Sequence, residues 1–316
     1  MSAREVVQLS ERCLSAAGIP DGTAQASAEA FWWTQAYRGS GLTTLHGLLD
    51  DLSEYDRERI TLSETGSTVS VVDSGGQPGL LSSIPLLDLC RAQADRHGLG
   101  IAYTTLPDGD DTLCTLGHVA YKAARRGFVA LVSYTDPGRR STAVLGAPDQ
   151  PQPLLAEREL DAPSETHVAL LEAIDEGIHR RRHGPLIQAV FRRSTETSYR
   201  TAMRRLLDRL LGGALDPPRR PSRDAEPGLL TVCIDPRHPT FESAGTETVH
   251  RLVDDDDHSL TRVYRPERMQ DRIRTLLHDG VDVDETVWRD VFERSSRVLA
   301  PEFEGSHRGA GMDINE

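Results

Sequence analysis

The first part of the chain has the hydrophobic spacing of amphipathic helices. Apolar residues recur every three or four positions over 6–14, which is the period of one helix face. A second helix is predicted over 24–36, with Asp21 or Thr23 as its N-cap, and a third over 43–56. We expect each of these helices to bury its apolar face against a larger body.

The period changes after residue 67, where strands and helices begin to alternate. The predicted strands lie at 69–72, 101–105 and 128–134, and the predicted helices at 80–97 and 116–126. This alternation is typical of an α/β domain. None of these strands is followed by G-x-G-x-x-G, so the sequence does not predict a Rossmann phosphate loop.

The second half of the chain is less regular. Residues 137–160 are rich in Pro, Gly, Arg and Gln and are predicted to form a loop region. Beyond them the pattern predicts a strand at 229–234 and helices at 198–211, 246–253, 269–277 and 285–291. We therefore expect an N-terminal helical segment (1–66), a central α/β domain (67–245) and a C-terminal helical segment (246–316) that packs with the first.

The chain is strongly acidic, with 36 Lys and Arg against 49 Asp and Glu and a formal net charge of -13. Negative charge repels a phosphate backbone, so we expect no nucleic acid as a partner. The longest apolar stretches, such as 79–89, are too short and too interrupted to span a bilayer, so we expect no membrane partner either. These observations predict a cytoplasmic protein.

The cysteines and the lysine restrict the chemistry further. Cys13, Cys90, Cys114 and Cys233 are widely separated and form no C-x-x-C pair. We expect buried free thiols and neither a disulfide framework nor a metal site. Lys122 is the only lysine in the chain, so any site that requires a lysine has one candidate.

Several short motifs follow one another in a recognisable order. They are Arg38-Gly39; Gly117, Ala120, Ala123 and Gly127 in one predicted helix; Ile234-Asp235-Pro236; Arg265-Pro266-Glu267-Arg268; and the segment 281–288. In this order they resemble the malate/L-lactate dehydrogenase family that lacks a Rossmann fold. That group contains ureidoglycolate and sulfolactate dehydrogenases and piperideine-2-carboxylate reductases.

The resemblance implies an α/β fold in which a mixed sheet domain is flanked by a helical domain built from the N- and C-terminal segments. It also implies a homodimer. Members of the family reduce a 2-oxo acid or a cyclic imine with NAD(P)H. That reaction requires a proton donor, a cation for the substrate carboxylate and a bound nicotinamide.

The resemblance places the first catalytic histidine of the family in one of two registers. When positions are counted from Arg38-Gly39 without gaps, the family's Ser-His-Gly motif falls on Leu42-Thr43-Thr44. Its carboxylate-binding arginine then falls on Gly47. A shifted register uses His46-Gly47 instead and puts Asp50 at the arginine position. Neither register supplies both groups, so His46 as a proton donor and Thr43 as a hydrogen-bonding group both stay open.

The second catalytic histidine of the family falls on Thr112, after Asp111 in place of asparagine. A threonine is no acid near neutral pH, whereas Asp110 or Asp111 becomes one if a dry pocket raises its pKa. The alternative for the two aspartates is a solvated turn with Gly109. His118 lies in the following helix and is expected to face elsewhere.

Candidate NAD(P)-binding residues follow from the same resemblance. Thr135-Asp136 stands where the family has threonine and asparagine, Gly146 lies in a shortened cofactor loop, and Ser164 ends a segment similar to D-M-A-T-S. The family's lysine falls near Glu196-Thr197, where a cation is replaced by an acid or a hydroxyl.

Three functions are consistent with these residues. The joint loss of proton donors, arginine, lysine and cofactor loop favours altered chemistry, such as that of a lyase or cyclase, on a small 2-oxo or 2-hydroxy acid or a cyclic imine, with no NAD(P) cofactor. The first alternative is a working NAD(P)-dependent oxidoreductase with a rebuilt site, and the second is a non-catalytic partner of an active paralogue.

Overall fold

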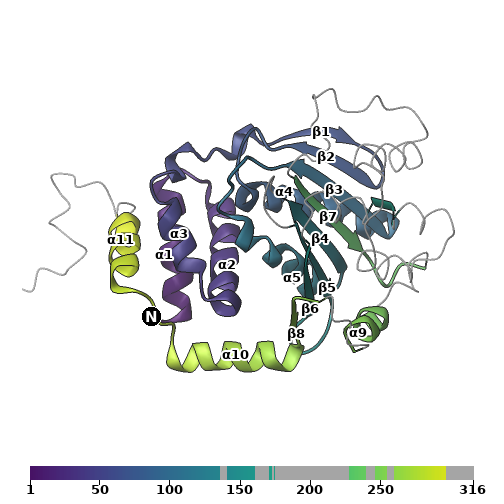
Figure 1. Cartoon of the computed structure of the whole chain (residues 1–316). Helices are drawn as coiled ribbons and strands as arrows, with labels where there is room; N and C mark the ends of the chain where they lie inside the picture. Colours follow the sequence, from purple (N-terminus) through teal and green to yellow (C-terminus); the bar gives the residue numbers. More distant parts are fainter. Residues whose placement is uncertain are drawn as a thin grey trace, which may run out of the picture.

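An eight-stranded mixed sheet forms the centre of the molecule, and helices from both ends of the chain gather beside it (Figure 1). The computed structural model describes residues 1–135, 141–160, 171–172, 174, 228–239, 246–254 and 260–296. The predicted helix over 198–211 lies outside these residues.

The strands are arranged in the order β1-β2-β3-β7-β4-β5-β6-β8. Their bounds are β1 Thr61–Thr65, β2 Val69–Asp73, β3 Leu99–Thr105, β4 Val129–Thr135, β5 Ser141–Ala147, β6 Leu154–Leu160, β7 Gly228–Ile234 and β8 Arg262–Tyr264. Strands β2 and β3 are parallel, and every other neighbouring pair is antiparallel. Strand β7, late in the sequence, therefore lies between β3 and β4 and is buried along its whole length.

The helices divide between the sheet and the group beside it. Their bounds are α1 Ala3–Ala16, α2 Asp21–Arg38, α3 Gly41–Leu48, α4 Gly79–His97, α5 Gly117–Arg125, α9 Thr246–Asp254, α10 Pro266–Asp279 and α11 Glu285–Ser296. Helices α4 and α5 pack on one face of the sheet, through β3 and β7 and through β4 and β5, respectively. The apolar residues of this face and of the two helices form one continuous core.

The helical group joins the two ends of the chain. Helix α11 packs against α1 and α3, and α10 contacts α2 (Figure 1). The thiol of Cys13 in α1 donates to the carbonyl oxygen of Val291 in α11 at 3.3 Å, and the N-terminal ammonium donates to the carbonyl oxygen of Val281 at 3.1 Å. The predicted packing of the C-terminal helices on the N-terminal ones is therefore confirmed.

Two predictions about secondary structure were wrong. The helix predicted over 43–56 ends at Leu48, and a turn and the 3-10 helix Leu52–Glu54 follow it. The predicted loop region over 137–160 contains β5 and β6 in its described part. Strand β6 carries charged residues, and such a composition is typical of loops. In the structure, however, Glu157 is buried in an ion pair.

Other features agree with expectation. The strands near 69–72, 101–105, 128–134 and 229–234 are present, as are the helices near 6–14, 24–36, 80–97, 116–126, 246–253, 269–277 and 285–291. The four cysteines are free; Cys114 is half-buried and the other three are buried. In the described part of the chain, no helix has both the length and the apolar character needed to cross a membrane.

Candidate functional site

Asp110 and Thr112 lie at the N-terminus of α4. A carboxylate oxygen of Asp110 accepts a hydrogen bond from the backbone N–H of Gly79 at 2.6 Å. The hydroxyl of Thr112 accepts from the N–H of Leu80 at 3.0 Å and donates to Asp110 at 2.5 Å. Because the first N–H groups of a helix have no partner within it, these two side chains cap α4 from a distant loop.

This geometry differs from the predicted solvated turn. Asp110 is buried, and burial raises its pKa although hydrogen bonds from Thr112 and Gly79 act in the opposite direction. Thr112 is also buried, and its hydroxyl both donates and accepts within this cap. Of the predicted residues in this loop, only Asp111 is exposed.

The residues predicted on α3 point in different directions. Thr43 is exposed, and the imidazole Nε2 of His46 lies 2.8 Å from a carboxylate oxygen of Asp290 on α11. Thr44 instead contacts the loop before α5, where its hydroxyl lies 3.3 Å from the thiol of Cys114. The structure thus brings the two motif segments together through Thr44 and Cys114, whereas His46 pairs with the C-terminal helix.

The candidate cofactor residues are only partly described. Asp136 and Ser164 lie outside the described residues, as do Glu196 and Thr197. Thr135 is buried within the sheet beside Gly228 of β7. A Cβ atom at Gly146 would lie 2.7 Å from the carbonyl oxygen of Ala120 in α5, so this glycine permits close packing of helix on sheet. The two described residues thus lie in β4 and β5 of the sheet, and their role in binding a nicotinamide stays a prediction.

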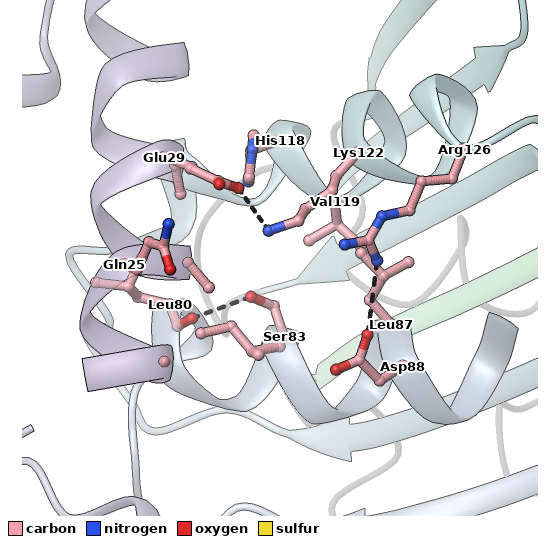
Figure 2. A pocket seen from close by; sticks show the side chains of 14 residues that line it. Gln25, Glu29, Leu80, Ser83, Leu87, Asp88, His118, Val119, Lys122 and Arg126 are labelled. Atoms are coloured by element: carbon pink, nitrogen blue, oxygen red, sulfur yellow. Dashed lines mark hydrogen bonds and ion pairs between the residues drawn. The ribbon is translucent and has the colours of Figure 1, made fainter. Parts of the chain in front are cut away.

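A pocket of about 280 Å³ lies between α2, α4 and α5 (Figure 2). Three side chains with basic groups line it at intervals of four residues: His118 and Lys122 of α5 and Arg126, the C-cap of that helix. This spacing places them on one face of the helix. The exposed fraction of these three residues, which we call the basic stripe, rises from the floor of the pocket to its rim. It is 7% for His118, 21% for Lys122 and 41% for Arg126. Apolar side chains such as Leu80, Leu87 and Val119 complete the lining.

Two acids face this basic stripe from the neighbouring helices. The ammonium of Lys122 lies 2.6 Å from a carboxylate oxygen of Glu29 on α2. The guanidinium of Arg126 lies 3.8 Å from a carboxylate oxygen of Asp88 on α4. Figure 2 shows both pairs at the edge of the pocket. The charged side chains are therefore arranged as two cations, each with an acid beside it.

His118 is the deepest of the three basic residues. Its ring packs against Trp33 and Tyr121, with centroid distances of 6.4 and 6.1 Å. Burial, reinforced by Lys122 and Arg126, lowers its pKa to about 3, so the imidazole is neutral at neutral pH. Its ring makes no hydrogen bond to another residue that the structure describes.

Sequence reasoning missed this pocket. The spacing predicts that His118 faces away from the reaction site. In the sequence, Lys122 stands out only as the single lysine. The signal that could have identified the stripe is the spacing of basic residues at 118, 122 and 126 on a helix that is otherwise rich in alanine.

Comparison with known proteins supports the fold. No protein-family model matches the chain, and no curated protein matches it. Among solved structures, the chain is similar to malate dehydrogenase from Pyrococcus horikoshii OT3, with a TM-score of 0.57, 18% identity and 96% of each chain covered. The chain shares the fold of that protein.

Two further structures agree. Sulfolactate dehydrogenase from Methanocaldococcus jannaschii has a TM-score of 0.56 and 12% identity, with 95% of this chain and 97% of that chain covered. Δ1-piperideine-2-carboxylate reductase from Pseudomonas syringae pv. tomato has a TM-score of 0.52 and 16% identity, with 93% of this chain and 99% of that chain covered. The predicted malate/L-lactate dehydrogenase-like fold is confirmed.

Proposed function

We propose that this chain is a cytoplasmic protein that binds a small carboxylic acid, a 2-oxo or 2-hydroxy acid or a related cyclic imine, and acts on it without hydride transfer from NAD(P)H. One observation carries the proposal. Asp110 and Thr112, in the loop that the resemblance associates with the proton donor, are buried and hydrogen-bonded to the N-terminus of α4. Groups held in this way are poorly placed to give a proton to a substrate.

The pocket between α2, α4 and α5 supplies the binding groups. Lys122 and Arg126 are suited to a carboxylate, since ammonium and guanidinium groups make strong charge-assisted hydrogen bonds to it. The apolar lining accommodates the rest of a small acid. A neutral imidazole with a pKa near 3 is a weak base, so His118 is better suited to accepting a hydrogen bond than a proton.

Titration with NADH and NADPH, followed by nicotinamide fluorescence, tests the cofactor part of the proposal. We expect no change up to millimolar concentrations. In parallel, calorimetry with malate, lactate and piperideine-2-carboxylate measures binding of the acid. We expect one of them to bind and Lys122→Met to weaken that binding about tenfold, as the loss of a charge-assisted hydrogen bond implies.

A working NAD(P)-dependent oxidoreductase with a rebuilt site is the second candidate. The observation that favours it is the similarity to a malate dehydrogenase, a sulfolactate dehydrogenase and a reductase over nearly the whole chain. Micromolar binding of either nicotinamide would support this candidate and refute the proposal of cofactor-free chemistry.

We also propose a homodimer, which the same resemblance implies. On α11, the rings of Trp288 and Phe292 stack at a centroid distance of 5.3 Å, and both side chains are exposed. Exposed aromatic pairs of this kind are common at protein contacts. Sedimentation velocity tests the proposal, and we expect a dimer. A monomer at about 100 μM, a concentration high enough to populate a weak dimer, would refute it.

A further inference from the structure

The pocket between α2, α4 and α5 combines positive and negative side chains in equal number. Lys122 and Arg126 supply two positive charges, and Glu29 and Asp88 supply two negative charges. His118, at the floor, is neutral. A purely anionic ligand would meet Glu29 beside Lys122, and a purely cationic ligand would meet Lys122 beside Glu29. Either one leaves an unfavourable contact between like charges.

From this charge pattern we infer that the pocket binds a free α-amino acid with an apolar side chain, whose carboxylate lies at Lys122 and Arg126 and whose ammonium lies at Glu29. This inference rests on the proposed function only for the binding of a small carboxylic acid in this pocket, and it replaces the 2-oxo or 2-hydroxy acid with an amino acid. A zwitterion offers each member of the Lys122–Glu29 pair a partner of opposite charge, so neither is left unpaired when the ligand separates them.

A second observation points to a ligand at the floor of the pocket. His118 is more than nine-tenths buried, lines the pocket, and makes no hydrogen bond to another described residue. A neutral imidazole has one donor and one acceptor nitrogen. The His118 nitrogens are not among the fully enclosed polar atoms that lack a partner, so an ammonium or carboxylate in the pocket would take the place of water there.

The size and lining of the pocket limit the side chain of the amino acid. A volume of about 280 Å³ is at the lower end for small-molecule sites. Leu80, Leu87 and Val119 give it an apolar wall. A branched aliphatic side chain therefore fits better than a charged one.

Three compounds with the same isobutyl side chain separate the contributions of the two charges. Leucine has both groups, 4-methyl-2-oxopentanoate has only the carboxylate, and 3-methylbutylamine has only the ammonium. We expect calorimetry on the full chain to show binding of leucine at least tenfold tighter than binding of either analogue.

The variant Glu29→Gln provides the sharper test. It removes the partner of the ammonium and the competitor for Lys122, so leucine should bind about tenfold more weakly and the oxo acid several-fold more tightly. Lys122→Met should weaken both. Asp271→Asn, which alters an exposed ion pair on α10, is the matched control and should change neither. Circular dichroism and thermal unfolding establish that each variant is folded.

The outcomes distinguish the amino-acid inference from the proposed function. If the oxo acid binds more tightly than leucine and Glu29→Gln weakens both equally, the amino-acid inference is refuted while binding of a small carboxylic acid stands. If none of the three compounds binds at millimolar concentration, and the acids tested above do not bind either, both are refuted for this pocket.

Discussion

A carboxylate oxygen of Asp110 lies 2.6 Å from the backbone nitrogen of Gly79, although 31 positions separate the two residues in the sequence. Together with Thr112, this contact caps α4 from the loop that follows β3. The loop is therefore tied to the helix that covers the sheet.

The cap predicts a loss of stability on substitution. Asp110→Ala should lower the free energy of unfolding by about 1–3 kcal/mol, because it removes the cap and leaves the N–H of Gly79 buried without an acceptor. Urea unfolding measures the change. Asp108→Ala, at an exposed residue of the same loop, is the control and should cost less than about 0.5 kcal/mol. Equal losses in the two variants would argue against the cap.

The low pKa of His118 predicts a pH dependence of stability. The folded protein keeps this imidazole neutral down to about pH 3, whereas its ordinary value is 6.5. Between these two pKa values the unfolded state therefore binds more protons than the folded state. The contribution of His118 to the free energy of unfolding is full above pH 6.5 and is lost as the pH falls below it. The slope is about 1.4 kcal/mol per pH unit.

His118→Leu isolates this contribution. Subtracting the unfolding free energy of the variant from that of the wild type, at each pH from 7 to 4, should give a difference that falls with decreasing pH. A difference independent of pH would show that the imidazole titrates normally in the folded state.

The buried ion pair between Arg38 and Glu157 predicts that loss of Arg38 lowers the stability of the protein much more than loss of Arg262. Glu157 is 2% exposed and lies 2.7 Å from the guanidinium of Arg38 and 3.7 Å from that of the more exposed Arg262. Arg38→Met leaves a buried carboxylate without its near partner and should cost about 3–5 kcal/mol. Arg262→Met should cost less than about 1 kcal/mol. Thermal and urea unfolding provide the comparison, and similar losses would contradict this reading.

Gly146 provides a test of whether it supports packing or a cofactor. In Gly146→Ala, the new methyl group meets the backbone of Ala120 in α5, so a loss of about 1–3 kcal/mol is expected. Gly47→Ala, where nothing lies within 4 Å, should be neutral or stabilising by up to about 1 kcal/mol. If Gly146→Ala kept full stability but abolished nicotinamide binding, its proposed packing role would be wrong.

The fold was predictable where the hydrophobic period is long and local. Helix α1 shows its apolar face directly in the sequence, and glycines at positions 39 and 98 end α2 and α4. Strands β5 and β6 were missed because their identity depends on neighbours. Strand β5 is buried on both faces and has no alternation, and Glu157 of β6 is buried only because Arg38 of α2 reaches it.

The candidate site was less predictable than the fold. The basic stripe of α5 is visible as a spacing in the sequence, but a spacing does not reveal what the stripe faces. The acids that complete the pocket come from α2 and α4, 93 residues before Lys122 in the case of Glu29. Likewise, the hydrogen bonds of Asp110 and Thr112 to the N-terminus of α4 join segments that are far apart in the sequence, so no local spacing reveals them.

The sequence by itself determined that this protein is an acidic α/β chain whose motifs follow the order of the malate/L-lactate dehydrogenases. Helix periods and glycine stops are local properties, so they can be read along the chain. Only the tertiary structure decided which polar residues are used to cap α4 and which line a pocket. Burial and hydrogen bonding between distant segments control both roles, and neither is encoded at any single position.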